Sequence, residues 1–362
     1  MICLLFTFGL YSAQEIWTRK KANTWYNKQA WLTGSNYLPS SAINQLEMFQ
    51  ESTFNTTIIE KELTIAKSLG FNTMRVFLHD LLWQQDAEGF KQRIDIFLSI
   101  CSRYNIKPLF VFFDSCWDPY PHAGKQRSPI EGLHNSGWIQ SPGADILKNE
   151  KKWSILESYV KDIINTFGKD ERILAWDIWN EPDNINEGSY QIFEPINKIE
   201  IVIKLLPKVF SWARSQNPIQ PLTSGVWTGE AWKKSDYHNL STIQKLQFDY
   251  SDIITFHSYS DPISFEKAIL SLKTWGRPII CTEYMARGMN NTVINIMPLG
   301  KKYNIGLINW GFIDGKEQTK YPWDSWKKKY TNDPPLWHHV LFHSDYLPYK
   351  SEEIRFIKSL RK

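Results

Sequence analysis

The chain has 362 residues and a formal net charge of +4, from 42 basic and 38 acidic side chains. A protein that binds nucleic acid usually concentrates a much larger basic excess on one face, and no basic run here is longer than three residues, as in the lysines of residues 327–329. Nucleic acid is therefore not an expected partner. The length suits one α/β barrel with elaborated loops, and because no linker or low-complexity tract divides the chain, residues 14–362 are expected to form a single domain.

The first residues form an apolar stretch followed by small residues, which resembles a secretory signal peptide cleaved after Ala13. The stretch is too short to span a bilayer. Residues 1–13 are therefore predicted to be a signal peptide of a secreted or periplasmic protein, with an N-terminal strand or a misassigned start as the alternatives. Its removal leaves Cys101, Cys116 and Cys281, an odd number that allows at most one disulfide.

From Trp31 onward, short apolar or β-branched runs alternate with longer segments of helical period, which is typical of repeated βα units. The expected strands are residues 32–37, 73–78, 108–113, 173–180, 221–226, 253–259, 278–284 and 306–311. The expected helices are residues 58–69, 91–104, 151–167, 196–216, 240–246, 263–274, 292–303 and 352–360. Eight such strands predict a (β/α)₈ TIM barrel, and the absence of a GxGxxG or P-loop motif argues against an open doubly wound sheet.

Two segments of the predicted barrel are long and lack a strong helical pattern. Residues 114–149 follow the third strand and residues 312–352 follow the eighth. Long loops in a compact domain tend to be functional, and the active sites of barrel enzymes lie at the carboxyl ends of the strands. These two segments are therefore expected to form the walls of a cleft.

Polar and aromatic residues gather where the predicted strands end. In chain order they are Arg75, His79, Asp114, Asn180, Glu181, His257, Tyr259, Glu283 and Trp310. In a parallel barrel the strand ends meet at a common mouth. The two glutamates stand in the frames WDIWNEP (residues 176–182) and PIICTEY (residues 278–284), each after an apolar run. Two carboxylates at such positions are what glycoside hydrolysis requires.

The ordered set resembles the clan A glycoside hydrolases and, within the clan, glycoside hydrolase family 5, the cellulase and mannanase family. The matching residues are Arg75, Asn180-Glu181-Pro182, His257-Ser258-Tyr259, Glu283 and Trp310, in an order that spans residues 31–362. The chain departs from this family at the third strand, where the usual His is missing from residues 112–117; His79 is the candidate to replace it.

The resemblance implies a retaining glycosidase in which Glu283 is the nucleophile and Glu181 the general acid and base. Arg75 and Tyr259 are expected to hold Glu283 as the anion, and the nearby charge of Glu283 is expected to raise the pKa of Glu181. Asn180 is expected to bind the 2-hydroxyl of the sugar.

Aromatic side chains make up 15% of the chain, including 17 Trp, and the apolar face of a pyranose stacks well on an indole. Trp310 is expected to line the subsite at the cleavage point, and His79 and His257 are further substrate-binding candidates. Outer platforms could come from Trp117, Trp138, Trp227, Trp323 or Trp326.

The sequence shows no HExxH motif and no clustered His and Cys residues, so neither a metal nor a cofactor is expected. The expected partner is an oligosaccharide or polysaccharide, and the expected state is a monomer. Two alternatives remain open: a catalytically inactive carbohydrate-binding barrel, and a transglycosylase on the same scaffold. The choice among glucan, mannan and xylan, and between endo and exo action, also remains open.

Overall fold

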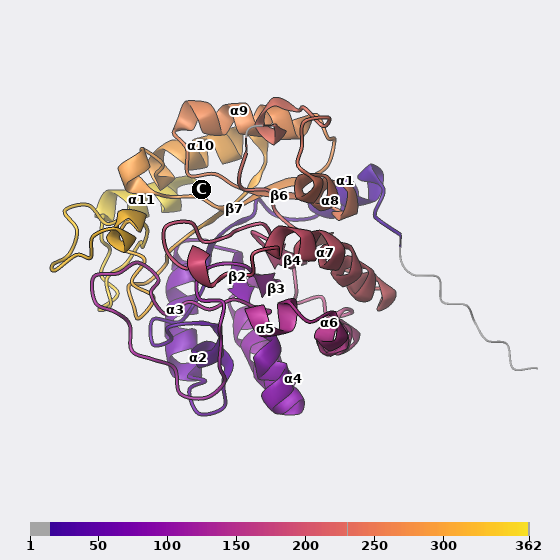
Figure 1. Ribbon diagram of the computed structural model, residues 1–362. Helices are drawn as coiled ribbons and strands as arrows, with labels where there is room; N and C mark the ends of the chain where they lie inside the picture. The colour runs from indigo at the N-terminus through magenta and orange to yellow at the C-terminus, as the bar shows by residue number, and fades with distance from the viewer. Residues whose placement is uncertain (1–14, 230, 361–362) are drawn as a thin grey trace, which may run out of the picture.

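The computed structural model describes residues 15–229 and 231–360 and contains one eight-stranded parallel sheet within them, surrounded by helices (Figure 1). The predicted signal peptide, residues 1–13, lies outside the described residues. The strands are β1 (Thr33–Asn36), β2 (Thr73–Phe77), β3 (Lys107–Asp114), β4 (Ala175–Asn180), β5 (Leu222–Thr223), β6 (Ile254–His257), β7 (Ile279–Glu283) and β8 (Gly306–Asn309).

The sheet curls into a nearly closed barrel. Its strands follow the order β5-β4-β3-β2-β1-β8-β7-β6, so β5 and β6 are the edge strands of the sheet, and the barrel closes only where these two strands pair. A parallel bridge between Val226 and Phe256 joins the β5 and β6 segments. The Thr223 hydroxyl adds hydrogen bonds to the Ile253 carbonyl (3.0 Å) and to the Thr255 hydroxyl (2.8 Å). The predicted (β/α)₈ barrel is thus confirmed, although β5 is much shorter than the predicted strand 221–226.

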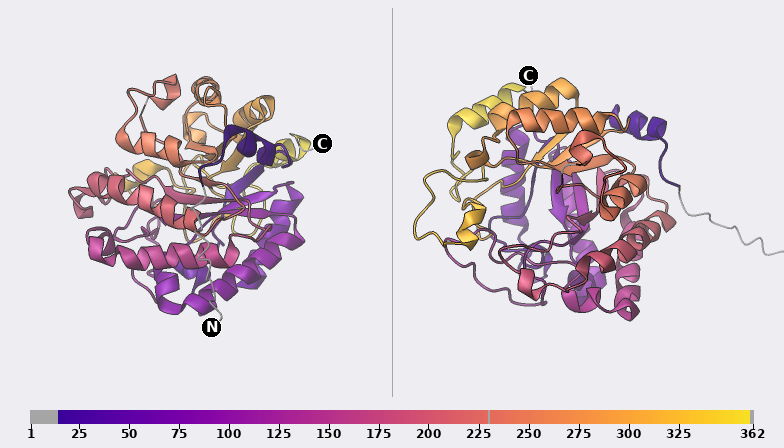
Figure 2. Two further views of the ribbon diagram at one scale, coloured as in Figure 1. Left: turned by 90° about the vertical axis from the view of Figure 1, so that its right-hand side faces the viewer. Right: turned by 45° about the horizontal axis from the view of Figure 1, so that its top comes forward.

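Helices follow the strands and form the outer ring, which Figure 2 shows from two further directions. The helices that correspond to predicted segments are α3 (Thr56–Ser68), α4 (Asp80–Arg103), α6 (Trp153–Phe167), α7 (Lys198–Ser215), α8 (Thr242–Tyr250), α9 (Pro262–Lys273), α10 (Val293–Tyr303) and α11 (Ser351–Leu360). Three short helices were not predicted: α1 (Arg19–Tyr26), α2 (Gln45–Phe49) and α5 (Ala144–Leu147).

Helix α4 begins well before the predicted residue 91. Asp86 interrupts it with non-helical backbone angles (φ −161°, ψ 81°), so the helical period of the sequence is broken near its start. Elsewhere the helix starts follow ordinary capping chemistry, because Ser241 forms a capping box at α8 and the Asp261 carboxylate accepts two backbone N–H groups at α9.

The strands are buried on both faces, which explains why they appear in the sequence as apolar runs. Every residue of β2 and of β4 is buried. Two of these residues are charged: Arg75 and Asp177 both have fully buried side chains inside the barrel. Because an uncompensated charge is costly in such a place, the interior of the barrel must pair these groups closely.

The two long loops, after β3 and after β8, lie against each other. The His134 N–H donates to the Ser325 hydroxyl (2.9 Å), and the Trp326 indole donates to the His134 carbonyl (2.9 Å). The Gly132 N–H donates to the Gln318 side chain (3.1 Å). In Figure 1 these loops run together at the side of the barrel near α11. They form one joint wall beside the strand ends, as the sequence predicted.

Cys101, Cys116 and Cys281 are all free in the described structure. Among the described helices, none is both long enough and apolar enough to cross a membrane.

Candidate active site

A cleft of about 710 Å³ opens at the carboxyl ends of the strands. Six of the nine strand-end residues singled out from the sequence lie in its lining: Asp114, Asn180, Glu181, Tyr259, Glu283 and Trp310. Both long loops, the loop after β4 and residues 227–228 after β5 contribute the rest of the wall. The cleft is therefore the place where the sequence-predicted site is assembled.

The two glutamates face each other across a short gap. One carboxylate oxygen of Glu181, one of Glu283 and one ring nitrogen of His257 lie within 4.8 Å of one another. The His257 Nδ1 atom is 2.8 Å from Glu181 Oε1 and 3.6 Å from Glu283 Oε2. Both glutamates are buried, with residue exposures of 8% for Glu181 and 5% for Glu283. A pair of carboxyl groups about 5–5.5 Å apart is the arrangement of retaining glycosidases.

Glu283, the last residue of β7, is held by two donors. Arg75 Nη1 lies 2.9 Å from Glu283 Oε1, and the Tyr259 hydroxyl donates to Glu283 Oε2 at 2.8 Å. Burial raises the pKa of Glu283, and the charge of Glu181 adds to this rise, whereas His257, Arg75 and Tyr259 oppose it. The two contacts expected from the sequence are therefore present, and both favour the carboxylate form.

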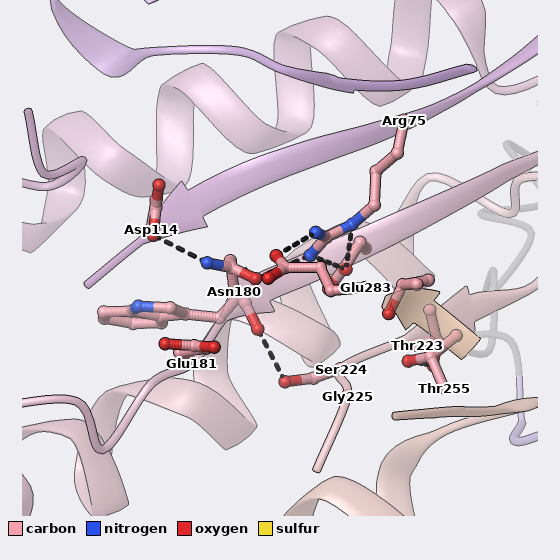
Figure 3. A network of polar contacts seen from close by, with 12 residues as sticks. Arg75, Asp114, Asn180, Glu181, Thr223, Ser224, Gly225, Thr255 and Glu283 are labelled. Carbon is pink, nitrogen blue, oxygen red and sulfur yellow. Dashed lines mark hydrogen bonds and ion pairs between the residues drawn. The ribbon is translucent and has the colours of Figure 1, made fainter. Parts of the chain in front are cut away.

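Arg75 stands at the centre of a wider network, drawn in Figure 3. Its Nη2 atom donates to Asp177 Oδ2 (2.7 Å) and to Asn180 Oδ1 (2.7 Å), and Nη1 donates to Asn36 Oδ1 (3.0 Å). Asp177 and Asn36 were not predicted as site residues. Both lie on strands, and Asp177 was visible in the sequence only as a charge within an apolar run. They fix the guanidinium that in turn contacts Glu283.

Glu181 follows β4 directly and has its own set of partners. His257 Nδ1 lies 2.8 Å from Oε1, while the Asn184 amide (2.7 Å) and the Cys116 thiol (3.2 Å) donate to Oε2. Burial lowers the pKa of His257 to about 4, which fits a neutral imidazole that carries its proton on Nδ1 and donates it to Glu181. Asn184 and Cys116 were missed in the sequence, because neither ends a predicted strand.

Burial raises the pKa of Glu181 to about 7. The hydrogen bonds from Asn184 and Cys116 oppose this rise, and the charge of Asp183 adds to it. The sequence had led us to expect Glu283 as the cause. The expected direction is therefore found, but desolvation in the cleft wall is the main cause rather than the opposing carboxylate.

Asn180 is anchored at both ends of its amide. Its Oδ1 atom accepts from Arg75, and its Nδ2 atom donates to Asp114 Oδ1 (2.9 Å). The Trp138 indole donates to the other oxygen of Asp114 (2.6 Å), and burial raises the pKa of Asp114 to about 6. Asn180 Nδ2 also donates to the Cys116 sulfur at 3.4 Å, and because sulfur is a weak acceptor this is the contact that a sugar hydroxyl can replace at least cost.

Tryptophans cover much of the cleft lining. Among the described residues, all five proposed outer platforms and Trp310 line the cleft: Trp117, Trp138, Trp227, Trp310, Trp323 and Trp326. The rings of Trp117 and Trp326 are stacked, with centroids 5.0 Å apart and planes inclined by 12°. Trp310 packs edge-on against Phe77 and Trp138 and is half-buried in the same cleft that the two glutamates line.

His79, predicted to bind substrate, is not part of the cleft lining. It is fully buried and forms the N-cap of α4, where its Nδ1 atom accepts from the Leu81 N–H (3.1 Å). The expectation that it takes the place of the missing strand-three His is not supported. It lies two residues after the end of β2, and α4 begins at the next residue, so its ring is engaged at the start of the helix.

The backbone around the cleft adopts uncommon angles. Glu181 (φ 45°), Trp117 (φ 68°) and Met285 (φ 82°) are in the left-handed region, which costs energy for residues other than glycine. Such strained backbone persists only where the surrounding structure holds it in place, and it is found often at functional sites. The strained residues here are the predicted acid Glu181, the cleft-lining Trp117, and Met285 in the turn after Glu283.

No protein-family model and no curated protein matches the sequence. Among solved structures, the chain shares the fold of barrel glycoside hydrolases. GH5_18 from Streptomyces cattleya, solved in complex with GlcNAc, is 12% identical with a TM-score of 0.60 over 92% of this chain and 80% of that one. The β-mannanase of the blue mussel Mytilus edulis is 16% identical with a TM-score of 0.55, over 82% and 89%.

A third structure, the exo-β-1,4-mannosidase Op5Man5 from Opitutaceae bacterium strain TAV5, is 16% identical with a TM-score of 0.58. It is aligned over 92% of this chain and 60% of its own length. At these identities the likeness establishes a common fold. The function of this chain must be argued from its own site.

Proposed function

We propose that this protein is a retaining glycoside hydrolase that cleaves β-linked glycosidic bonds, with Glu283 as the nucleophile and Glu181 as the general acid and base. The observation that carries the proposal is the approach of the two carboxylates, whose nearest oxygens lie within 4.8 Å of each other at the floor of the cleft. An inverting enzyme would need a wider gap, because a water molecule must fit between the carboxylate and the sugar.

In the first step, a Glu283 oxygen attacks the anomeric carbon as the bond to the leaving oxygen breaks, and the Glu181 proton passes to that oxygen. Arg75 and Tyr259 favour the ionised form of Glu283 that this step requires. The pKa of Glu181, raised to about 7 by burial, keeps this group protonated in a substantial fraction of molecules near neutral pH.

In the second step, Glu181, now a carboxylate, accepts a proton from water, and the resulting hydroxide oxygen displaces Glu283 from the sugar. Asn184 and His257 donate to Glu181 and stabilise this anionic form. Asn180 exchanges its weak bond to the Cys116 sulfur for one to the sugar 2-hydroxyl, a contact that strengthens as the ring flattens in the transition state.

The structural neighbours guide the choice of substrate. They include an exo-β-1,4-mannosidase, β-mannanases and a β-glucosidase. β-Linked mannosides and glucosides are therefore the first compounds to test, with xylans as a third class. We also propose that the N-terminal segment directs export, and that the catalytic unit is a monomer.

The test is the release of sugar from β-mannans, β-glucans, xylans and the corresponding aryl glycosides, by the wild-type protein and by Glu283→Ala. Turnover of at least one compound by the wild type, lost in the variant, is the expected result. If no compound is turned over while oligosaccharides still bind, the protein is a carbohydrate-binding barrel and the proposal is wrong. Products that form only with an added acceptor sugar would identify a transglycosylase instead.

A further inference from the structure

A buried ion pair lies beneath the loop that follows β4. The side chains of Lys198, the first residue of α7, and of Glu194 are only 1% and 3% exposed, and Lys198 Nζ lies 2.8 Å from Glu194 Oε1. Lys198 Nζ also donates to the carbonyl oxygens of Asn184 (2.7 Å) and Ser115 (3.2 Å) and to the side-chain oxygen of Gln140 (3.1 Å). Four acceptors around one nitrogen fit the charged ammonium form.

Glu194 gathers donors from the loops after β3 and β4. Its Oε1 atom accepts from the side-chain amide of Asn186 (2.5 Å) and from that of Gln140 (2.6 Å). The backbone N–H of Asn186 in turn donates to Asn184 Oδ1 (2.7 Å). Asn184 is therefore held at two points, because Lys198 binds its carbonyl and Asn186, which Glu194 fixes, binds its side chain.

The place of this ion pair is informative because charges are costly to bury. Burial lowers the pKa of Lys198, and the charge of Glu194 opposes this fall. The other titratable groups that oppose it are those of Cys116 and Asp114. A buried ion pair often contributes no more to stability than apolar residues of the same volume, so the geometry that it imposes explains it better. Here that geometry concerns Asn184, whose amide donates to Glu181 Oε2 at 2.7 Å.

We propose that Lys198 and Glu194 are positioning residues that hold the side-chain amide of Asn184 against the carboxyl group of Glu181. The role of this contact in catalysis rests on the proposed function of Glu181 as the general acid, but the contact itself is measurable without turnover. Asn184 donates to the charged form of Glu181, so loss of the ion pair should raise the pKa of Glu181 above its present value of about 7.

The experiment follows the titration of Glu181 by ¹³C NMR of the full chain, labelled at the carboxyl carbons of its glutamate side chains. A group with a pKa of about 7 stands apart from exposed glutamates, which titrate near about 4.3, and Glu181→Gln identifies its signal. Lys198→Met is expected to raise the pKa of Glu181 by about 1 unit, because the bond from Asn184 is weakened. In an Asn184→Ala background the same substitution should add no further rise, because the ion pair acts through Asn184.

Lys204→Met is the matched control, since it removes an exposed lysine of the same helix that lies 3.5 Å from Glu150 Oε1. It should leave the pKa of Glu181 unchanged, and circular dichroism should show that the variants are folded. If Lys198→Met does not fold, Glu194→Gln supplies the test. Its expected rise of about 0.5 unit should also disappear in the Asn184→Ala background.

The proposal is overturned if the pKa of Glu181 stays in place in the folded variants of the ion pair, or if Lys204→Met raises it equally. It is also overturned if the rise is the same with and without Asn184, because the lost charge would then act on Glu181 through space. A titration that behaves as expected in a protein that hydrolyses no glycoside would contradict the proposed function and leave the positioning role intact. An unmoved titration in an active glycosidase would contradict the positioning role alone.

Discussion

Asn184 offers the sharpest test of how the site controls the proton on Glu181. Its amide orientation is fixed, because Asn184 Oδ1 accepts from the Asn186 N–H (2.7 Å) and leaves Nδ2 as a donor to Glu181 Oε2 (2.7 Å). This donor stabilises the Glu181 carboxylate, so Asn184→Ala should raise the pKa of Glu181 above its present value of about 7. The acid form then persists to higher pH.

The size of the shift follows from the energy of the lost contact. A hydrogen bond to a charged group contributes about 1.5–3 kcal/mol, and one pKa unit corresponds to about 1.4 kcal/mol, so a shift of about 1–2 units is expected. Because the first step needs protonated Glu181, kcat/KM falls as pH rises through its pKa. The alkaline limb of the profile should therefore move from about pH 7 to about pH 8–9.

The assay is the pH dependence of kcat/KM on an aryl glycoside whose leaving group needs protonation. Asn184→Asp is the matched control, since it keeps the shape and the bond from the Asn186 N–H but replaces the donor by a second carboxylate. Its alkaline limb should rise at least as far as that of Asn184→Ala. If the limb stays in place in both variants, or if Asn184→Asp resembles the wild type, the assignment of Glu181 as the acid set by Asn184 is refuted.

Three further changes test the rest of the site. Tyr259→Phe removes a donor to Glu283 Oε2, so the acid limb of the same profile should move up by about 1–2 pH units, and an unmoved limb would contradict the role given to Tyr259. Arg75→Met leaves Asp177 and Glu283 buried without their cation, which should destabilise the fold by about 3–5 kcal/mol. For a chain of this length, this loss corresponds to a fall in Tm of about 4–7 °C, measured by circular dichroism, and an unchanged Tm would disprove the buried pairing. Trp310→Ala should lower kcat/KM on oligosaccharides roughly 30-fold, as loss of an aromatic anchor worth about 2 kcal/mol would, and wild-type kinetics would exclude Trp310 from the subsite.

The sequence predicted the barrel and several of the residues that gather at its mouth because parallel strands leave two strong signals. Strands buried on both faces appear as apolar runs, and their carboxyl ends converge, so Asn180, Glu181 and Glu283 could be placed together without coordinates. Arg75 was also recognised, although it lies within β2 and reaches the site through its long side chain.

The remainder depends on features that the sequence does not encode locally. His79 caps a helix because α4 begins at the next residue, Asp80. The sequence did not predict this start, because Asp86 interrupts the helical period of the first part of α4. The path of the loop after Glu181 brings Asn184 back to the carboxylate. The pKa of Glu181 follows mainly from burial, which depends on how the long loops pack over the strand ends and therefore required the structure.

The central claim is that Glu283 forms a covalent bond with the sugar. A 2-deoxy-2-fluoro glycoside with a reactive leaving group, matched to the substrate found in the panel, slows the release of the sugar from the enzyme and traps this intermediate. Mass spectrometry of the digested protein should then locate one added sugar on the peptide that contains Glu283. A label on a different residue, or unlabelled protein that turns over its natural substrate with inversion at the anomeric carbon, would contradict the account.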